Sequence, residues 1–182
     1  NSYTTQAAPT VTVVSPVTGP LAGGTTMTIT GTNFRTGASV SVVGTSCTSA
    51  TVVNSTTMTC VTAARTAGNG NVVVTNTDAQ SGTLASAFTY QGAPTVTSVV
   101  PSNGVDDGGT AVTINGTNFA SDISNISFGG SACASVVWVN STQLTCTTTA
   151  HASGSVSVTA TNQDGQTGTL AAAYTYDPNP TI

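Results

Sequence analysis

Polar and apolar residues alternate along several short segments of this chain. Between 26 and 30, Met27 and Ile29 are each flanked by threonines, and Val112 and Ile114 follow the same period further on. A period of two is typical of a β-strand that turns one face toward a core. Segment 10–15 is rich in valine and threonine, which favour a pleated, half-buried surface. In the first half of the chain the pattern predicts strands at 10–15, 26–30, 39–43, 51–53, 57–62, 71–76 and 84–90.

Turn-forming residues separate these segments. Gly, Pro, Asn and Asp fall between the predicted strands, where turns need a positive or a preset φ. No long segment shows the 3.6-residue period of a helix. About seven short strands in roughly 85 residues are typical of an all-β, immunoglobulin-like Greek-key sandwich.

The whole pattern occurs twice. The sequence GTNF at 31–34 returns unchanged at 116–119, and the matches continue to the last predicted strand of each copy. An internal repeat of this length predicts two tandem domains of one fold. We place them at 7–90 and 94–176, with a short linker at 91–93. Equivalent residues include Cys47 and Cys133, Asn54 and Asn140, Cys60 and Cys146, Asn76 and Asn162, and Tyr90 and Tyr176.

The linker and the chain ends predict an extended arrangement. Residues 1–6 match the end of a preceding repeat or a linker strand, with Tyr3 where Phe88 stands, and 177–182 match the start of a following linker or repeat. A three-residue linker is too short for free tumbling, so we expect the domains to form a semi-rigid line. We also expect residues 1–6 to pack as a strand or against a neighbouring copy. Sheet edges without Lys invite contacts between chains, including a filament.

Composition narrows the functional classes. Only 4% of residues are charged, two Arg and six Asp, and the net charge is −4. An ordinary domain has about a quarter charged residues. Without a basic cluster, binding to nucleic acid or to an anionic membrane surface is not expected. No segment has the length and apolarity of a membrane span, so we expect no membrane insertion. One His, no Glu and no Lys leave little for acid–base chemistry, so no enzyme and no cofactor are predicted.

The four cysteines form one pair in each predicted domain. Cys60 shares strand parity with Met58, and Cys146 with Leu144, so both thiols should point inward. Local Cys47–Cys60 and Cys133–Cys146 bridges would each contribute about 3 kcal/mol in the chain-entropy model. They would also indicate an oxidising, extracytoplasmic setting. The alternative is buried free thiols in a reducing compartment; zinc is disfavoured because there is no CxxC spacing.

The glycine pattern of both copies resembles a known family. In the first copy it runs from Pro16 through Gly19, Gly23-Gly24-Thr25 and Ile29-Thr30-Gly31 to Phe34, and the second copy repeats it from Pro101 to Phe119. This pattern resembles the opening of an IPT/TIG domain. Ile126-Ser127-Phe128-Gly129 resembles the family's next strand, whereas the first copy has Val43 before Gly44. The resemblance implies an immunoglobulin-like scaffold without common catalytic residues, found in receptors, bacterial surface proteins, starch-acting enzymes and transcription factors.

Few residues are candidates for ligand chemistry. Trp138 is the one candidate for ligand contact, for example with a sugar, although a lone Trp on a strand usually serves packing. Turn aspartates could offer oxygen ligands to calcium, but no Asp-x-Asp run exists, so no metal site is predicted. His151 is expected to be an exposed loop residue, and the threonine row at 26–32 to face solvent. Glycosylation sequons occur at Asn54, Asn115 and Asn140.

These observations predict a non-catalytic structural or assembly module. We expect a stalk, spacer or filament-forming repeat of an extracellular or cell-surface protein, with neighbouring copies or further repeats as partners. The alternative is an adhesin module that binds carbohydrate or a host surface protein. An exposed pair of aromatic residues near Trp138 would favour this alternative.

Overall fold

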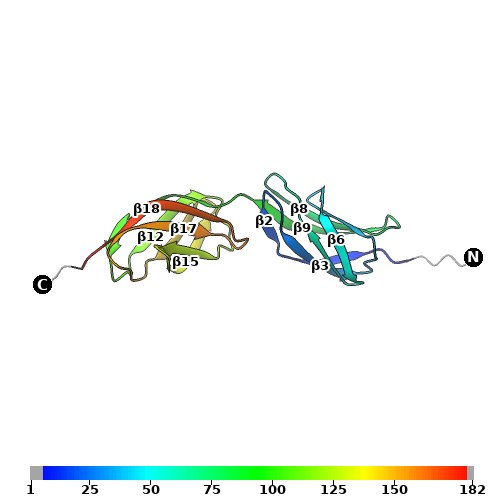
Figure 1. Cartoon of the computed structure of the whole chain (residues 1–182), viewed down its shortest axis with the longest axis horizontal. Helices are drawn as coiled ribbons and strands as arrows, with labels where there is room; N and C mark the ends of the chain where they lie inside the picture. Colours follow the sequence, from blue (N-terminus) through cyan, green and yellow to red (C-terminus); the bar gives the residue numbers. More distant parts are fainter. Residues whose placement is uncertain (1–5, 180–182) are drawn as a thin grey trace, which may run out of the picture. The chain divides into compact units, whose positions relative to one another are not determined.

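The chain forms two compact units, Asn1–Gly92 and Ala93–Ile182, called domain 1 and domain 2 below. A computed structural model describes residues 6–179, and every regular element in that range is a strand (Figure 1). Within it, no helix is long and apolar enough to cross a membrane. The packing expected for residues 1–5 and the repeat start expected at 180–182 lie outside the described residues.

Each domain is a sandwich of two sheets, as the sequence predicts. In domain 1 the four-stranded sheet has the order β1-β3-β7-β6, and the five-stranded sheet has the order β2-β9-β8-β4-β5. The strands are β1 (Thr10–Ser15), β2 (Thr18–Pro20), β3 (Thr26–Thr32), β4 (Ser39–Val42), β5 (Thr45–Ser46), β6 (Thr48–Asn54), β7 (Thr57–Val61), β8 (Gly68–Thr75) and β9 (Ser81–Gln91).

Domain 2 repeats this topology strand for strand. Its sheets have the orders β10-β12-β16-β15 and β11-β18-β17-β13-β14. The strands are β10 (Thr95–Val100), β11 (Asn103–Val105), β12 (Ala111–Thr117), β13 (Asn125–Phe128), β14 (Ser131–Ala132), β15 (Ala134–Asn140), β16 (Gln143–Thr147), β17 (Gly154–Thr161) and β18 (Thr167–Asp177).

The strand β3 shows how the alternating sequence builds the sandwich. Its residues alternate between exposed and buried along all of its length, with Met27 and Ile29 fully buried. The threonines at 26, 28, 30 and 32 face solvent, as the period of two predicts. Thr28 lies opposite Thr59 of β7, so hydroxyl side chains continue across the outer face of the sheet. The inner face packs with Met58 into the core.

Two glycines of the repeated pattern are required by close backbone contacts. A side chain at Gly31 would collide with the carbonyl oxygen of Thr10, so glycine allows β1 to lie against β3. Gly23 has a positive φ of 72° and lies against the backbone of Ala63. A side chain there would be both strained and blocked. Gly116 and Gly108 are in the equivalent situations in domain 2.

The first strand of each domain changes sheets, which the sequence pattern did not predict. After β1 the chain passes Pro16, whose ring nitrogen cannot donate to a ladder, and continues as β2 in the other sheet. There β2 pairs in parallel with the end of β9. Because β1 leaves its sheet at this point, a groove opens between β1 and β9.

Candidate functional site

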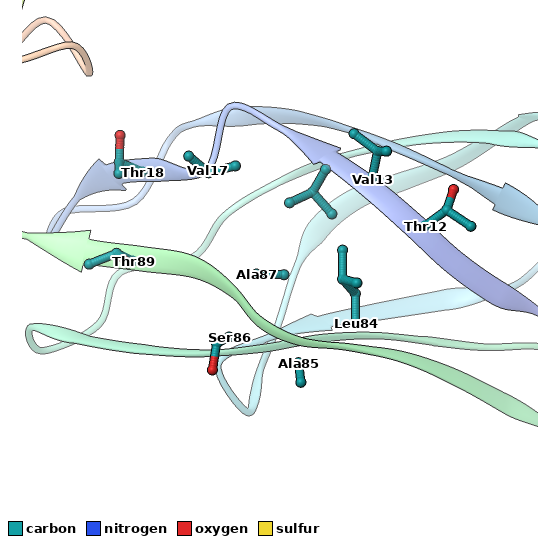
Figure 2. Close-up of a pocket in the computed structure, with 10 residues that line it drawn as sticks. Thr12, Val13, Val17, Thr18, Leu84, Ala85, Ser86, Ala87 and Thr89 are labelled. Carbon is teal, nitrogen blue, oxygen red and sulfur yellow. The ribbon is translucent and has the colours of Figure 1, made fainter. Parts of the chain in front are cut away.

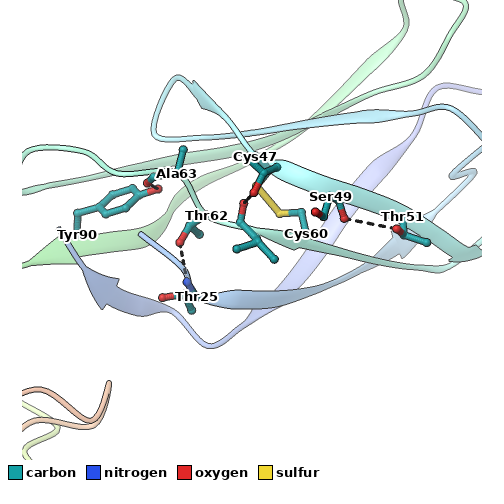
Figure 3. Close-up of a disulfide and its surroundings, with 10 residues drawn as sticks. Thr25, Cys47, Ser49, Thr51, Cys60, Thr62, Ala63 and Tyr90 are labelled. Carbon is teal, nitrogen blue, oxygen red and sulfur yellow. Dashed lines mark hydrogen bonds between the residues drawn. A yellow bond between two sulfur atoms is a disulfide. The ribbon is translucent and has the colours of Figure 1, made fainter. Parts of the chain in front are cut away.

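Each domain contains one disulfide, which links the connection before β6 or β15 to the neighbouring strand β7 or β16. Cys47, between β5 and β6, is bonded to Cys60 of β7, with the Cα atoms 5.9 Å apart (Figure 3). Cys133 and Cys146 are bonded in domain 2, at 6.0 Å. Both Cα separations fit ordinary disulfides. Cys60 and Cys146 are buried, and each bridge closes a short loop between neighbouring strands.

Beside the disulfide of domain 1, buried hydroxyl groups satisfy the backbone at the end of the sandwich. The Thr62 hydroxyl accepts a hydrogen bond from the Thr25 amide at 3.1 Å, and the Tyr90 hydroxyl donates to the Ala63 carbonyl at 3.0 Å (Figure 3). Burial raises the pKa of Tyr90 above its ordinary value. A hydrogen bond between Tyr90 and the Thr62 side chain, and the charge of Arg65, lower this pKa by less than burial raises it. These contacts hold the loop that follows β7 and give no sign of a reactive group.

Domain 2 keeps this arrangement. The Thr110 amide donates to the Thr148 hydroxyl at 3.1 Å, and the Tyr176 hydroxyl donates to the Thr149 carbonyl at 3.1 Å. Burial, with a smaller contribution from neighbouring Tyr174, raises the pKa of Tyr176. The repeated contacts are structural.

His151 lies in a loop, as predicted, but it is half-buried rather than exposed. Its ring is half-buried and stacks on Tyr176, with ring centroids 5.0 Å apart and planes 18° apart. Its Nδ1 lies 2.8 Å from the Ala152 carbonyl oxygen. Arg65 holds the equivalent place in domain 1, where it donates to the Val43 carbonyl and to the Thr45 hydroxyl. The sequence pattern did not predict this stacking, because a loop residue and a strand residue distant in sequence meet only in the folded domain.

Trp138 lies on β15, the last strand of its sheet, and is 39% exposed. Its Nε1–H donates to the Phe119 carbonyl at 3.0 Å, so the indole already has its one hydrogen bond. Its neighbours Val137 and Val139 are also exposed, at 55% and 46%. Every other aromatic side chain among residues 6–179 is buried. The described residues therefore offer no pair of exposed aromatics for a sugar ring.

Domain 1 has a groove between β1 and β9 (Figure 2). It has a volume of about 500 Å³. Val14, Leu84 and Ala87 line it, and Val13 and Val17 stand beside it, 55% and 52% exposed. No charged side chain lines it. It is an apolar surface that the sequence pattern did not reveal.

Where the chain enters each domain, an asparagine binds the incoming segment. The Asn33 side chain donates to the Ala8 carbonyl at 2.9 Å, and the Asn118 side chain donates to the Ala93 carbonyl at 3.0 Å. Both have positive φ, at 58° and 57°, a conformation that asparagine tolerates. We call this contact the entry clamp. Ala93 belongs to the predicted linker, so in domain 2 the entry clamp holds a linker residue.

A buried asparagine supports each entry clamp. Asn76 is 3% exposed; its Nδ2 donates to the Asn33 carbonyl at 2.9 Å, and its Oδ1 accepts from the Arg35 amide at 3.3 Å. Asn162 is fully buried and makes the same two contacts with Asn118 and Ala120. Both hydrogen-bonding ends are used, so burial of these amides is compensated. Sequence reasoning found these residues only as matches between the repeats.

The few charged residues lie in loops or at strand ends. Arg35 and Asp78 form an ion pair at 2.6 Å, both partly exposed. Among the described residues, no group of three acidic, histidine or cysteine side chains is arranged to hold a metal ion. Because the charged residues lie in loops or at strand ends, the sheet faces within residues 6–179 carry no charged side chain. The charged positions are Arg35, Arg65, Asp78, Asp106, Asp107, Asp122, Asp164 and, at the end of β18, Asp177.

The three sequons differ in accessibility. Asn54 and Asn140 are exposed at the last positions of β6 and β15, and each side-chain oxygen accepts hydrogen bonds from the threonine of its own sequon, Thr56 or Thr142. Asn115 is half-buried on β12, where it donates to the Ser98 hydroxyl and accepts from Gln143. The two exposed positions at the strand ends are better placed for a bulky modification than Asn115.

The geometry defines a class: two tandem immunoglobulin-like sandwiches, each closed by one disulfide. Models of the IPT/TIG domain match residues 9–90 and 94–176, nearly the whole chain. The chain belongs to the IPT/TIG domain family.

Similar proteins are much longer than this chain. Fibrocystin-L of Mus musculus is 32% identical over 174 residues, which are 94% of this chain and 4% of that protein. Plexin-2 of Caenorhabditis briggsae is 33% identical over 107 residues, or 57% of this chain and 6% of its own length. Among solved structures, the full extracellular region of plexin A4 matches 98% of this chain and 16% of its own, with a TM-score of 0.58 and 24% identity. That structural likeness shows the fold alone.

Proposed function

We propose that this chain is a non-catalytic structural and assembly module, a stalk, spacer or filament-forming repeat, of an extracellular or cell-surface protein. One observation carries the proposal: the two domains share the parts that hold a repeat together. The disulfide, the buried asparagine and the entry clamp occur in both. An entry clamp is useful where a preceding segment must be held against the next domain.

The disulfides support the proposed extracellular setting, because disulfides persist in oxidising compartments. Neighbouring copies or further repeats are the proposed partners. Nucleic acid is not proposed as a partner, because the chain has only two Lys or Arg side chains. A cofactor or a catalytic role is likewise not proposed.

The second candidate is a module that binds carbohydrate or a surface protein. The exposed indole of Trp138 is the observation that favours it. The Trp138→Val variant distinguishes the assembly module from the binding module. It should fold, because domain 1 carries Val52 at the equivalent position.

The test is a binding screen of the full chain and of Trp138→Val against arrays of polysaccharides, alongside sedimentation velocity. The structural module predicts no saturable glycan binding by either protein. Saturable binding by a monomer, abolished by Trp138→Val, would overturn the proposal in favour of the binding module.

A further inference from the structure

The two domains have the same fold but different exposed apolar surfaces. In domain 1 the groove between β1 and β9 is flanked by Val13 and Val17. At the equivalent positions domain 2 carries Ser98 and Ser102. The fold therefore does not require valines at these positions. We call this surface of domain 1 the apolar groove (Figure 2).

Domain 2 carries the converse feature. Three consecutive residues of β15 expose apolar side chains: Val137, Trp138 and Val139. At the equivalent positions domain 1 has the more polar Thr51, the smaller Val52 and an identical valine, Val53. We call segment 137–139 the apolar strand. The apolar strand is therefore larger in domain 2, the domain that has serines where domain 1 has the groove valines.

Both surfaces also lie on sheet edges. The groove is bounded by β1, and the apolar strand belongs to β15; each is the last strand of its sheet. A strand at the edge of a sheet presents main-chain donors and acceptors that another strand can pair with. Neither the residues that line the groove nor segment 137–139 include the Lys or Pro that commonly blocks such pairing.

The chemistry of the two surfaces is matched. Neither contains a charged residue, so docking one on the other buries no unpaired charge. The Trp138 Nε1–H is already bonded to Phe119, so the rest of the indole can enter an apolar site without losing a hydrogen bond. A groove of about 500 Å³ is within the size range of sites that take large apolar groups.

We propose that the apolar strand of one molecule binds in the apolar groove of a second copy of this chain. This rests on the proposed assembly function and names the surfaces that carry it. Because each molecule offers a groove on domain 1 and a strand on domain 2, the contact is heterologous. A heterologous contact links copies head to tail, into a ring or an open line.

Two variants, which carry residues of the equivalent positions in the other domain, test the contact. Val13→Ser with Val17→Ser gives the groove the residues of domain 2, and Trp138→Val gives the strand the residue of domain 1. Sedimentation velocity over rising concentration should show wild-type oligomers that lengthen, whereas each variant alone should stay monomeric. Val53→Ser is the matched control. Val53 is 61% exposed on β6 of domain 1 and belongs to neither surface, so this substitution should leave assembly unchanged. Val17→Ser alone serves if the double variant does not fold by circular dichroism.

Mixing the variants gives the sharper result. The groove variant keeps its apolar strand and the Trp138→Val variant keeps its groove, so the mixture should form dimers that grow no further. Oligomers that persist in both variants, or a mixture that stays monomeric, would overturn the inference and leave the module proposal standing.

Other outcomes point to other contacts. If Trp138→Val is monomeric while the groove variant still assembles, the copies pair through their β15 strands instead. Loss in Val53→Ser would indicate unspecific association. Monomeric wild type would also overturn the inference and leave a spacer role.

Discussion

Tyr174 and Phe88 occupy equivalent positions and differ by one hydroxyl group. Among the described residues, the Tyr174 hydroxyl is buried and has no hydrogen-bond partner. Removing an unsatisfied buried hydroxyl should stabilise a protein. We expect Tyr174→Phe to raise the unfolding free energy of domain 2 by about 1 kcal/mol. Denaturant unfolding followed by the fluorescence of Trp138, which lies in domain 2, measures it.

Tyr176→Phe is the matched control. It loses the hydrogen bond from the Tyr176 hydroxyl to the Thr149 carbonyl, so it should lower the unfolding free energy by about 1 kcal/mol. A loss of stability in Tyr174→Phe as large as in Tyr176→Phe would show that the Tyr174 hydroxyl does have a partner.

The buried tyrosines also set a pH dependence. Burial raises the pKa of Tyr90 and of Tyr176 above 10.0 in the folded chain. A raised pKa means that the folded state holds the proton more tightly than the unfolded state. Its contribution to stability is fully present below about pH 10 and is lost as the pH rises through the folded pKa. Denaturation midpoints should be level from pH 7 to about 10 and then fall. In Tyr176→Phe the midpoint of domain 2 should fall less above about pH 10 than in the wild-type chain. An equally steep fall would show that Tyr176 does not cause the pH dependence.

At the scale of the elements, the entry clamp predicts how the linker behaves. Asn118→Gly keeps a residue that tolerates positive φ but removes the hydrogen bond to Ala93. We expect the two domains to tumble more independently, measured by NMR relaxation of the full chain. Asn33→Gly is the control, because it frees only the segment before domain 1. Equal effects of both variants, or none, would contradict a role of the entry clamp at the linker.

The strands that could be predicted were those with a complete local pattern. The alternation around Met27 and Ile29 predicted β3 correctly, including the exposed threonines. The three-residue β2 was missed because its pairing depends on β9, far away in sequence. Segment 51–53 is only the middle of β6, since a register shift between Thr48 and Thr51 interrupts the pattern. Bulges and parallel pairing are set by the tertiary fold.

The candidate surfaces were harder to predict than the fold. Trp138 was found because it is the one Trp, but its exposure depends on the edge position of β15. The groove arises where β1 leaves its sheet, and no local pattern reports that. The buried Asn76 and Asn162 carried a signal, because both repeats keep them. Repeat comparison thus identified residues whose role only the hydrogen bonds explain.

At the scale of the whole molecule, the central claim is that the chain is a structural module that associates with its own copies. Electron microscopy of the native chain over a range of concentrations tests this most directly. We predict single particles at low concentration and lines or rings of linked particles at high concentration. Single particles at every concentration would contradict the account.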